Sequence, residues 1–380
     1  MRSHSFRVKT LVLLAFIASG LSACGFGGNA GRLSLSLTDV ATDRYQAVYV
    51  TIREVAVHKS GDTEDSWTVV AAPNRTYNLL NLVNGVRENL ALAELTSGHY
   101  TQLRLLLGDT PDDGVNILSR AHPYANYVVD NAGQYHEVKV PSGFRTGVKV
   151  VQGFDINENQ TTELILDFDA SKSVVVAGRS GQYLMKPTIR VLSASDASVI
   201  SGSVTKAADQ VAVQGACVSA QVYDASAADP RDRVMVRGAT LSSETGAYKL
   251  FVAPGTYNVV AVGLGFAPLA AVVAAEAGMT YTQDFVLVEE PNYGKVSGTV
   301  TIPGTNGEAY ATLSFRQTVS LGGSDIEVEV QSVNVRDGGT YTVDLPVGSY
   351  TVVSSTAGMT TQEASVSVSK NTTTTLDITF

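Results

Sequence analysis

The first strong pattern in the chain is an alternation of apolar and polar residues, in which Leu33, Leu35 and Leu37 are separated by serines. Alternate side chains of a strand point to the same face, so the three leucines predict a strand with one buried face. The same period of two predicts further strands at residues 47–58, 100–107, 137–140, 146–154, 163–168 and 182–191. Val, Thr and Tyr are frequent throughout, and together these patterns predict a mainly β protein.

A helical period occurs in one place only, from Leu79 to Leu95, where apolar residues recur three and four positions apart. The dipeptide Asn84-Gly85 interrupts this run, so the pattern predicts two short turns of helix. They form a small helical insertion in a β-rich N-terminal domain over residues 31–195.

The C-terminal half of the chain contains an internal repeat. Residues Val199 to Thr205 recur as Lys295 to Thr301, and later Gly-x-Tyr and closing-strand motifs match at a constant offset of 93 residues. Strands separated by glycine turns predict two antiparallel sandwiches in tandem, over residues 197–290 and 295–380. The second unit departs from the pattern between Glu308 and Val335, so its strands there are not assigned.

Two family resemblances follow from these motifs. The succession of Ser-Gly-x-Val, Gly-x-Tyr and Gly-Thr-Tyr or Gly-Ser-Tyr resembles carboxypeptidase-regulatory-like domains, which implies a seven-stranded transthyretin-like sandwich and a structural or carbohydrate-binding role. Segments of the N-terminal domain, among them Pro141 to Lys149, Leu166 to Val174 and Lys186 to Val191, resemble a domain-of-unknown-function family of bacterial lipoproteins, number 4382. That family implies a class of protein but no activity.

Residues 1–23 have the pattern of a secretion signal. Arg2, Arg7 and Lys9 precede an apolar run from Leu11 to Leu21, which is too short to span a bilayer as a helix. The small residues that follow the run complete the signal.

The sequence Leu21-Ser22-Ala23-Cys24 resembles the lipobox of bacterial lipoproteins. This resemblance implies cleavage before Cys24 and acylation of its thiol, for example with palmitate. The following Gly25 implies sorting to the outer membrane of a Gram-negative bacterium, with the periplasmic or surface face undetermined. Residues 24–30 then form a flexible glycine-rich tether. The alternative is an ordinary cleaved signal peptide in which the cysteine is incidental.

The charge and cysteine content exclude some functions. Removal of the signal lowers the formal charge from -9 to -12, which disfavours nucleic acid and anionic lipid headgroups as partners. If Cys24 carries lipid, the chain's two cysteines cannot form a disulfide. Cys217 lies in an apolar stretch and is predicted to pack as a small hydrophobic residue.

Two aspartates offer a candidate metal site. Asp167 and Asp169 are two positions apart on a strand, which places both carboxylates on one face, and Asp112, Asp113 or Asp155 could complete an oxygen cage for calcium. The alternative is a hydrogen-bonded structural corner at the end of a strand. Apart from this possible Ca²⁺, no cofactor is predicted.

Exposed aromatic residues offer a candidate ligand site. Tyr124 and Tyr127 lie in a turn-rich segment, where their rings could stack on sugars, although a tyrosine in a β protein more often packs in the core. The Pro141-Ser142-Gly143 turn lacks the flanking residues of a serine nucleophile or a phosphate loop, so no catalytic residue is predicted.

These observations predict a non-enzymatic, lipid-anchored envelope protein for surface display, adhesion or envelope assembly. Its partners would be the membrane, through the lipid, and polysaccharide or envelope proteins. The three domains would follow one another in a row, with the repeats as spacers that project away from the membrane. The alternative is a carbohydrate- or calcium-binding accessory module on the cell surface.

Overall fold

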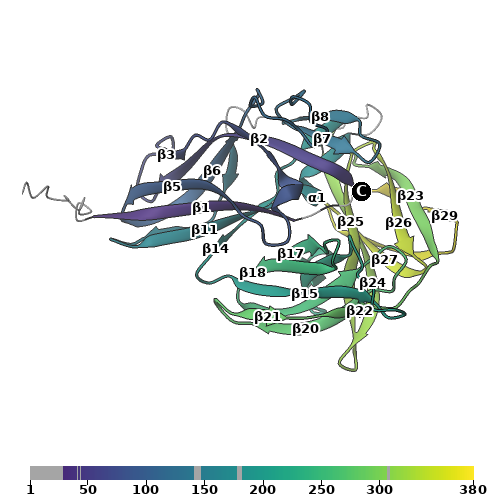
Figure 1. Cartoon of the computed structure of the whole chain (residues 1–380). Helices are drawn as coiled ribbons and strands as arrows, with labels where there is room; N and C mark the ends of the chain where they lie inside the picture. Colours follow the sequence, from purple (N-terminus) through teal and green to yellow (C-terminus); the bar gives the residue numbers. More distant parts are fainter. Residues whose placement is uncertain (1–28, 41, 43, 141–146, 178–181, 306–308) are drawn as a thin grey trace, which may run out of the picture.

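The computed structural model describes residues 29–40, 42, 44–140, 147–177, 182–305 and 309–380, and these residues form β-sheets with only short helical turns (Figure 1). The mainly β, multi-sandwich fold is therefore as predicted.

The N-terminal region contains two sheets. The smaller has the order β14 (Ile189–Ser193), β11 (Thr161–Asp169), β1 (Ala30–Val40), β5 (Glu88–Thr96). The larger has the order β10 (Phe154–Ile156), β6 (Gly98–Leu107), β2 (Tyr45–Lys59), β7 (Tyr127–Asp130), β8 (Tyr135–Lys139), β13 (Gln182–Met185), β12 (Val174–Ala177). Three short strands extend it: β3 (Thr68–Ala71) and β4 (Arg75–Asn78) pair with β2, and β9 (Val148–Val150) pairs with β6.

The alternating leucines of β1 form part of the core of this region. Leu33, Leu35 and Leu37 are fully buried, as the alternation predicts, and they belong to one hydrophobic cluster with residues of both sheets. Strand β1 pairs in parallel with β11 and antiparallel with β5, so its backbone is hydrogen-bonded on both sides.

The helical prediction for Leu79 to Leu95 is half wrong. A single 3-10 turn, η1 (Leu79–Leu82), buries two leucines, and the Asn78 side chain caps its start. The second half of the run is strand β5, because pairing with β1 satisfies its backbone groups. A three- and four-residue spacing over so few residues did not distinguish the strand from a helix.

The two repeats have the same topology. In the first repeat, one sheet has the order β18 (Ala247–Val252), β15 (Ser198–Lys206), β21 (Thr280–Thr282), and β22 (Phe285–Leu287) also pairs with β15. The other sheet has the order β17 (Val234–Leu241), β16 (Cys217–Tyr223), β19 (Gly255–Val262), β20 (Leu269–Ala275). In the second repeat, the first sheet has the order β26 (Thr340–Pro346), β23 (Tyr293–Thr301), β29 (Thr373–Thr375), and β30 (Ile378–Thr379) also pairs with β23. The second sheet has the order β25 (Ser324–Arg336), β24 (Tyr310–Leu321), β27 (Gly348–Thr356), β28 (Gln362–Val368). If β21 with β22, and β29 with β30, are each counted as one interrupted strand, each unit has the seven strands expected.

The repeated Ser-Gly motif has a packing reason. A Cβ on Gly202 would lie 2.0 Å from the carbonyl oxygen of Gln283, and one on Gly298 would lie 1.9 Å from that of Leu376. Both glycines therefore face the interruption of the closing strand, where only a hydrogen atom fits. The repeated tyrosines act at the same point, since the Tyr341 hydroxyl donates to the Leu376 carbonyl oxygen at 2.6 Å.

The segment between Glu308 and Val335, which departs from the repeat, is mainly a long hairpin. Strands β24 and β25 are much longer than β16 and β17 and are joined at Gly322 and Gly323, which both have positive φ. In Figure 1 this hairpin extends past the first repeat, at the bottom of the view. In the first repeat the corresponding connection contains the four-residue helix α2 (Pro230–Arg233) instead.

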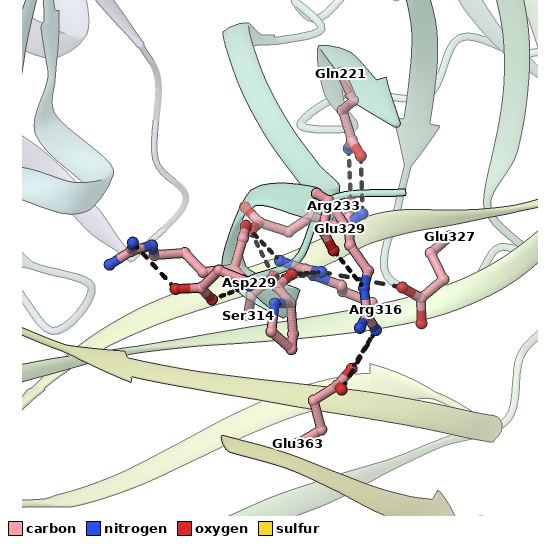
Figure 2. A network of polar contacts seen from close by, with 11 residues as sticks. Gln221, Asp229, Arg233, Ser314, Arg316, Glu327, Glu329 and Glu363 are labelled. Atoms are coloured by element: carbon pink, nitrogen blue, oxygen red, sulfur yellow. Dashed lines mark hydrogen bonds and ion pairs between the residues drawn. The ribbon is translucent and has the colours of Figure 1, made fainter. Parts of the chain in front are cut away.

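The hairpin joins the two repeats through a buried arginine (Figure 2). The guanidinium of Arg316, whose side chain is 2% exposed, donates to the backbone oxygens of Pro230 at 2.8 Å and Arg231 at 3.1 Å. Gln221 of β16 exchanges two 2.8 Å hydrogen bonds with the backbone of Glu329 on β25. Apolar contact adds to this interface, because Val260 of the first repeat belongs to the hydrophobic cluster of the second.

The three units do not follow one another in a row. Asn84 of the N-terminal region exchanges hydrogen bonds with the Thr240 hydroxyl of the first repeat, at 3.2 and 3.1 Å. The second repeat returns to the N-terminal region, where the Asn334 side chain donates to the Lys172 backbone oxygen at 2.6 Å and β25 lies against β12 and α1 (Ala170–Ser173). Each unit therefore contacts the other two, and the predicted linear arrangement is wrong.

Candidate functional site

The two tyrosines predicted to bind ligand have different environments. Tyr127, at the start of β7, is fully buried and stacks on Tyr49 with ring centroids 4.6 Å apart. It is a core residue, so its prediction as an exposed aromatic is wrong. Tyr124 is 40% exposed, and its ring meets that of Tyr127 edge-on at 6.4 Å.

Tyr124 borders a groove of about 580 Å³ on the larger sheet. Pro111 and Pro123 supply further apolar surface from the same loop, and Val138, Val140 and Leu184 line it from the sheet. The polar side chains of the groove are those of Asp109, Thr110, Asn126, Glu137 and Lys139. Glu137 and Lys139 are both exposed and lie two positions apart on β8, so they project from one face of the strand.

The loop that carries Tyr124 joins β6 to β7 and has no regular secondary structure over residues 108–126, apart from one isolated bridge. Hydrogen bonds hold both ends together: the Asn126 side chain donates to the Gly108 backbone oxygen at 2.8 Å and accepts from the Thr51 backbone N–H at 3.2 Å. The Thr51 hydroxyl also donates to the Ala125 backbone oxygen at 2.7 Å. The backbone beside Tyr124 is therefore fixed to the centre of strand β2.

Polar side chains also fix the part of the loop that lies between its ends. Asp112 accepts a hydrogen bond from the Thr76 backbone N–H at 2.9 Å, and the Tyr49 hydroxyl accepts one from the Ile117 N–H at 2.8 Å. His122 shares a 2.8 Å hydrogen bond with the Tyr127 hydroxyl. Burial lowers the pKa of His122, and the nearby Asp112 carboxylate opposes this shift. A histidine held this way orders the loop rather than facing a ligand.

The two aspartates predicted to bind calcium lie where the N-terminal region meets the repeats. Asp167 is buried and forms an ion pair with Arg190 at 3.3 Å, and Asp169 caps helix α1 by accepting from the Lys172 N–H at 3.1 Å. Burial raises the pKa of Asp167 to about 6, although the charge of Arg190 opposes the shift. The geometry is that of a hydrogen-bonded corner at the end of a strand.

Two of the residues expected to complete an oxygen cage with them have other partners. Asp112 accepts from the Thr76 N–H and lies 3.7 Å from His122 within the 108–126 loop, and Asp155 of β10 pairs with His99 of β6 at 2.8 Å. Over the described residues, no group of three or more His, Cys, Asp and Glu side chains is arranged to hold a metal ion.

A third acid, Asp39, was missed by the sequence reasoning. Its Oδ1 accepts from the Ala170 N–H at 3.0 Å, while its Oδ2 is buried without a hydrogen-bond partner among the described residues. Burial raises its pKa well above the usual value, and the charges of Asp169 and Asp167 add to the shift. The Thr38-Asp39 pair ends a strand of alternating leucines, and nothing in that pattern distinguishes a buried aspartate from a turn residue.

A second cavity, of about 350 Å³, lies where all three units meet. Its lining includes Arg44 and Asp169 of the N-terminal region, Cys217 of β16, and Gln331 and Asp344 of the second repeat. Cys217 is half-buried there, rather than in the core of its sandwich. The lining mixes charges of both signs with amides and does not select a ligand class.

Cys24 lies outside the described residues, as do Pro141, Ser142 and Gly143. Within the described part of the chain, no helix has the length and apolar character needed to cross a membrane.

The geometry thus defines a protein of tandem β-sandwiches in which an ordered loop displays an aromatic groove. Residues 30–187 match the family described as "Domain of unknown function (DUF4382)", which agrees with the resemblance seen in the N-terminal domain. A search of curated proteins finds no match.

Among solved structures, the chain is similar to the Bacillus anthracis TIE protein, with 13% identity and a TM-score of 0.20 over 93% of this chain and 50% of that chain. A streptococcal ancillary pilin has 11% identity and a TM-score of 0.21 over 91% and 99% of the two chains. The shaft pilin SpaA from Lactobacillus rhamnosus GG has 10% identity and a TM-score of 0.20 over 48% and 96%. The chain spans half the length of the Bacillus anthracis protein.

Proposed function

We propose that this protein is a non-enzymatic, lipid-anchored protein of the outer membrane that acts in surface display, adhesion or envelope assembly. The anchor is the acylated thiol of Cys24, the first residue after the signal. Two or more acyl chains hold a protein on a membrane stably, because each buried methylene contributes about 0.8 kcal/mol.

The observation that supports the proposal is the position of the first strand, which begins shortly after Cys24. Strand β1 begins at Ala30, six residues after Cys24, and ends beside α1, where the three units meet. Its 11 residues span roughly 35 Å. The lipid would thus hold the start of β1 near the membrane and direct the repeats and the Tyr124 loop away from it, as a display role requires. In Figure 1 the start of β1 lies at the left, and β7 and β8 lie towards the upper right.

Metabolic labelling with a palmitate analogue tests the anchor. The wild type is expected to incorporate the label and to sediment with outer membranes, whereas Cys24→Ala should do neither. Ser22→Ala keeps the cysteine and a small residue before it, and serves as the matched control. Membrane association of Cys24→Ala would contradict the proposal.

Protease treatment of intact cells then distinguishes display from assembly. Cleavage of the wild type without permeabilisation supports surface display or adhesion. Protection until the outer membrane is opened supports a periplasmic role in envelope assembly. A protease that reaches the protein can cleave the second repeat, because the Gly322-Gly323 turn at the tip of its hairpin is exposed.

A further inference from the structure

The loop of residues 108–126 is unusually long for a connection without helices or strands. Loops of this length within compact domains are uncommon and are usually functional when they are ordered. Here Asn126 and Thr51 fix its end and Tyr49 holds Ile117 at its middle, so the backbone around Tyr124 is held in place before any ligand arrives. A preorganised surface loses less conformational freedom on binding.

The lining of the groove indicates the class of ligand. Tyr124 is 40% exposed, and the face of an aromatic ring carries the negative side of its quadrupole, which attracts the polarised C–H groups on the flat side of a pyranose. Beside it, the carboxylates of Asp109 and Glu137 can accept hydrogen bonds from sugar hydroxyls, and the Lys139 ammonium can donate them. The volume of about 580 Å³ is that of a small-molecule site.

The charges of the groove select among sugars. Two carboxylates and one ammonium give it a small negative balance, which disfavours uronic acids, phosphates and sulfates. Peptides are disfavoured for a different reason. The aliphatic residues that line the groove from the sheet side, Val138, Val140 and Leu184, are all buried, so they present little surface on which a peptide side chain could anchor.

We propose that the groove between Tyr124 and strand β8 is a binding site for a neutral hexopyranose glycan. Tyr124 stacks on one ring, and Glu137 and Lys139 bind its hydroxyl groups. The site goes beyond the anchoring role and does not depend on it, because no residue of β1 lines the groove.

Saturation-transfer NMR and calorimetry on the mature chain in detergent test the site. The probes are gluco-, galacto- and manno-configured hexasaccharides, with a galacturonate hexasaccharide and a proline-rich decapeptide as competitors of the other classes. At least one neutral hexasaccharide should bind, and Tyr124→Ala should weaken that binding roughly tenfold. Tyr124→Phe keeps the ring and should retain most of the affinity, and Glu137→Gln should weaken it less than Tyr124→Ala does.

Tyr293 provides the matched control. It is 41% exposed, close to the 40% of Tyr124, but lies on β23 of the second repeat, so Tyr293→Ala should bind as the wild type does. Circular dichroism should show that each variant keeps the sheet content. Failure of all three neutral hexasaccharides to bind overturns the proposal, as does binding that Tyr124→Ala leaves unchanged, or a preference for the galacturonate or the peptide. The result is independent of palmitate labelling, so the glycan site and the lipid anchor can fail separately.

Discussion

At the residue scale, Asp167 makes the stability of the protein depend on pH. Its folded pKa of about 6 lies above the value of about 3.9 in an unfolded chain. Between these values the folded state binds more protons than the unfolded state, so stability falls as pH rises through this range and levels off above it. Asp39, whose pKa burial also raises, acts in the same direction.

Replacing Asp167 with asparagine isolates its contribution, because asparagine keeps the shape but does not titrate. The variant loses the ion pair with Arg190, and its destabilisation relative to wild type should be larger at pH 5 than at pH 7.5 by about 1 kcal/mol. Urea unfolding at the two pH values measures the difference. Asp325→Asn removes an exposed carboxylate at the β24–β25 turn and is the control. A pH-independent cost for Asp167→Asn would show that burial does not raise the pKa.

The limits of sequence reasoning are clearest for the tyrosine pair. Tyr124 and Tyr127 share a turn-rich segment, and only the pairing of β7 with β2 decides that one is buried against Tyr49 and the other borders a groove. Glu137 and Lys139 reach the same groove from another strand, so no local pattern could associate them with Tyr124. Single ligand-binding residues could be predicted from the sequence, but which residues share one site depends on the order of the strands in the sheet.

At the element scale, the sequence predicted the repeats well because their motifs serve local geometry. Gly202 and Gly298 must be glycine at the interruption of the closing strand, so the repeat is visible in the chain. The β24–β25 hairpin was not assignable, because its outer face is buried against another unit. Ser314 and Arg316 are polar and yet buried, which removes the alternation that identifies a strand with one buried face.

Substitution of Arg316 tests whether this hairpin stabilises the contact between the two repeats. Arg316→Ala leaves two backbone oxygens of α2 and the Glu327 carboxylate without their cation, and should destabilise the chain by about 3 kcal/mol. Arg237→Ala, which removes an exposed arginine of β17, should have little effect. Thermal unfolding of both variants measures the difference. Equal stability of the two would mean that the buried guanidinium contributes nothing to the junction.

At the scale of the whole molecule, contacts between units decide whether the protein is a string of spacers or one body. Most of the hydrophobic core of each unit is its own, which is why three units could be predicted from the sequence. Their closed arrangement depends on Asn84, Asn334 and Arg316, three polar residues whose partners in other units no sequence motif predicts. A closed body places the Tyr124 groove at a fixed position relative to the start of β1, which a flexible string would not do.

Removal of residues 293–380 distinguishes the two arrangements. In a string of independent units, the remaining residues would unfold at an unchanged midpoint. In the closed arrangement, the deletion exposes Val260 and the apolar face of β20 around Ala270, and it removes the hydrogen bond between Asn334 and Lys172. We therefore expect the truncated chain to fold, because its two other cores are intact, but to bind more of an apolar dye and to unfold several degrees lower. Calorimetry of the full chain should in turn show one cooperative transition rather than three, since units that share buried surface unfold together.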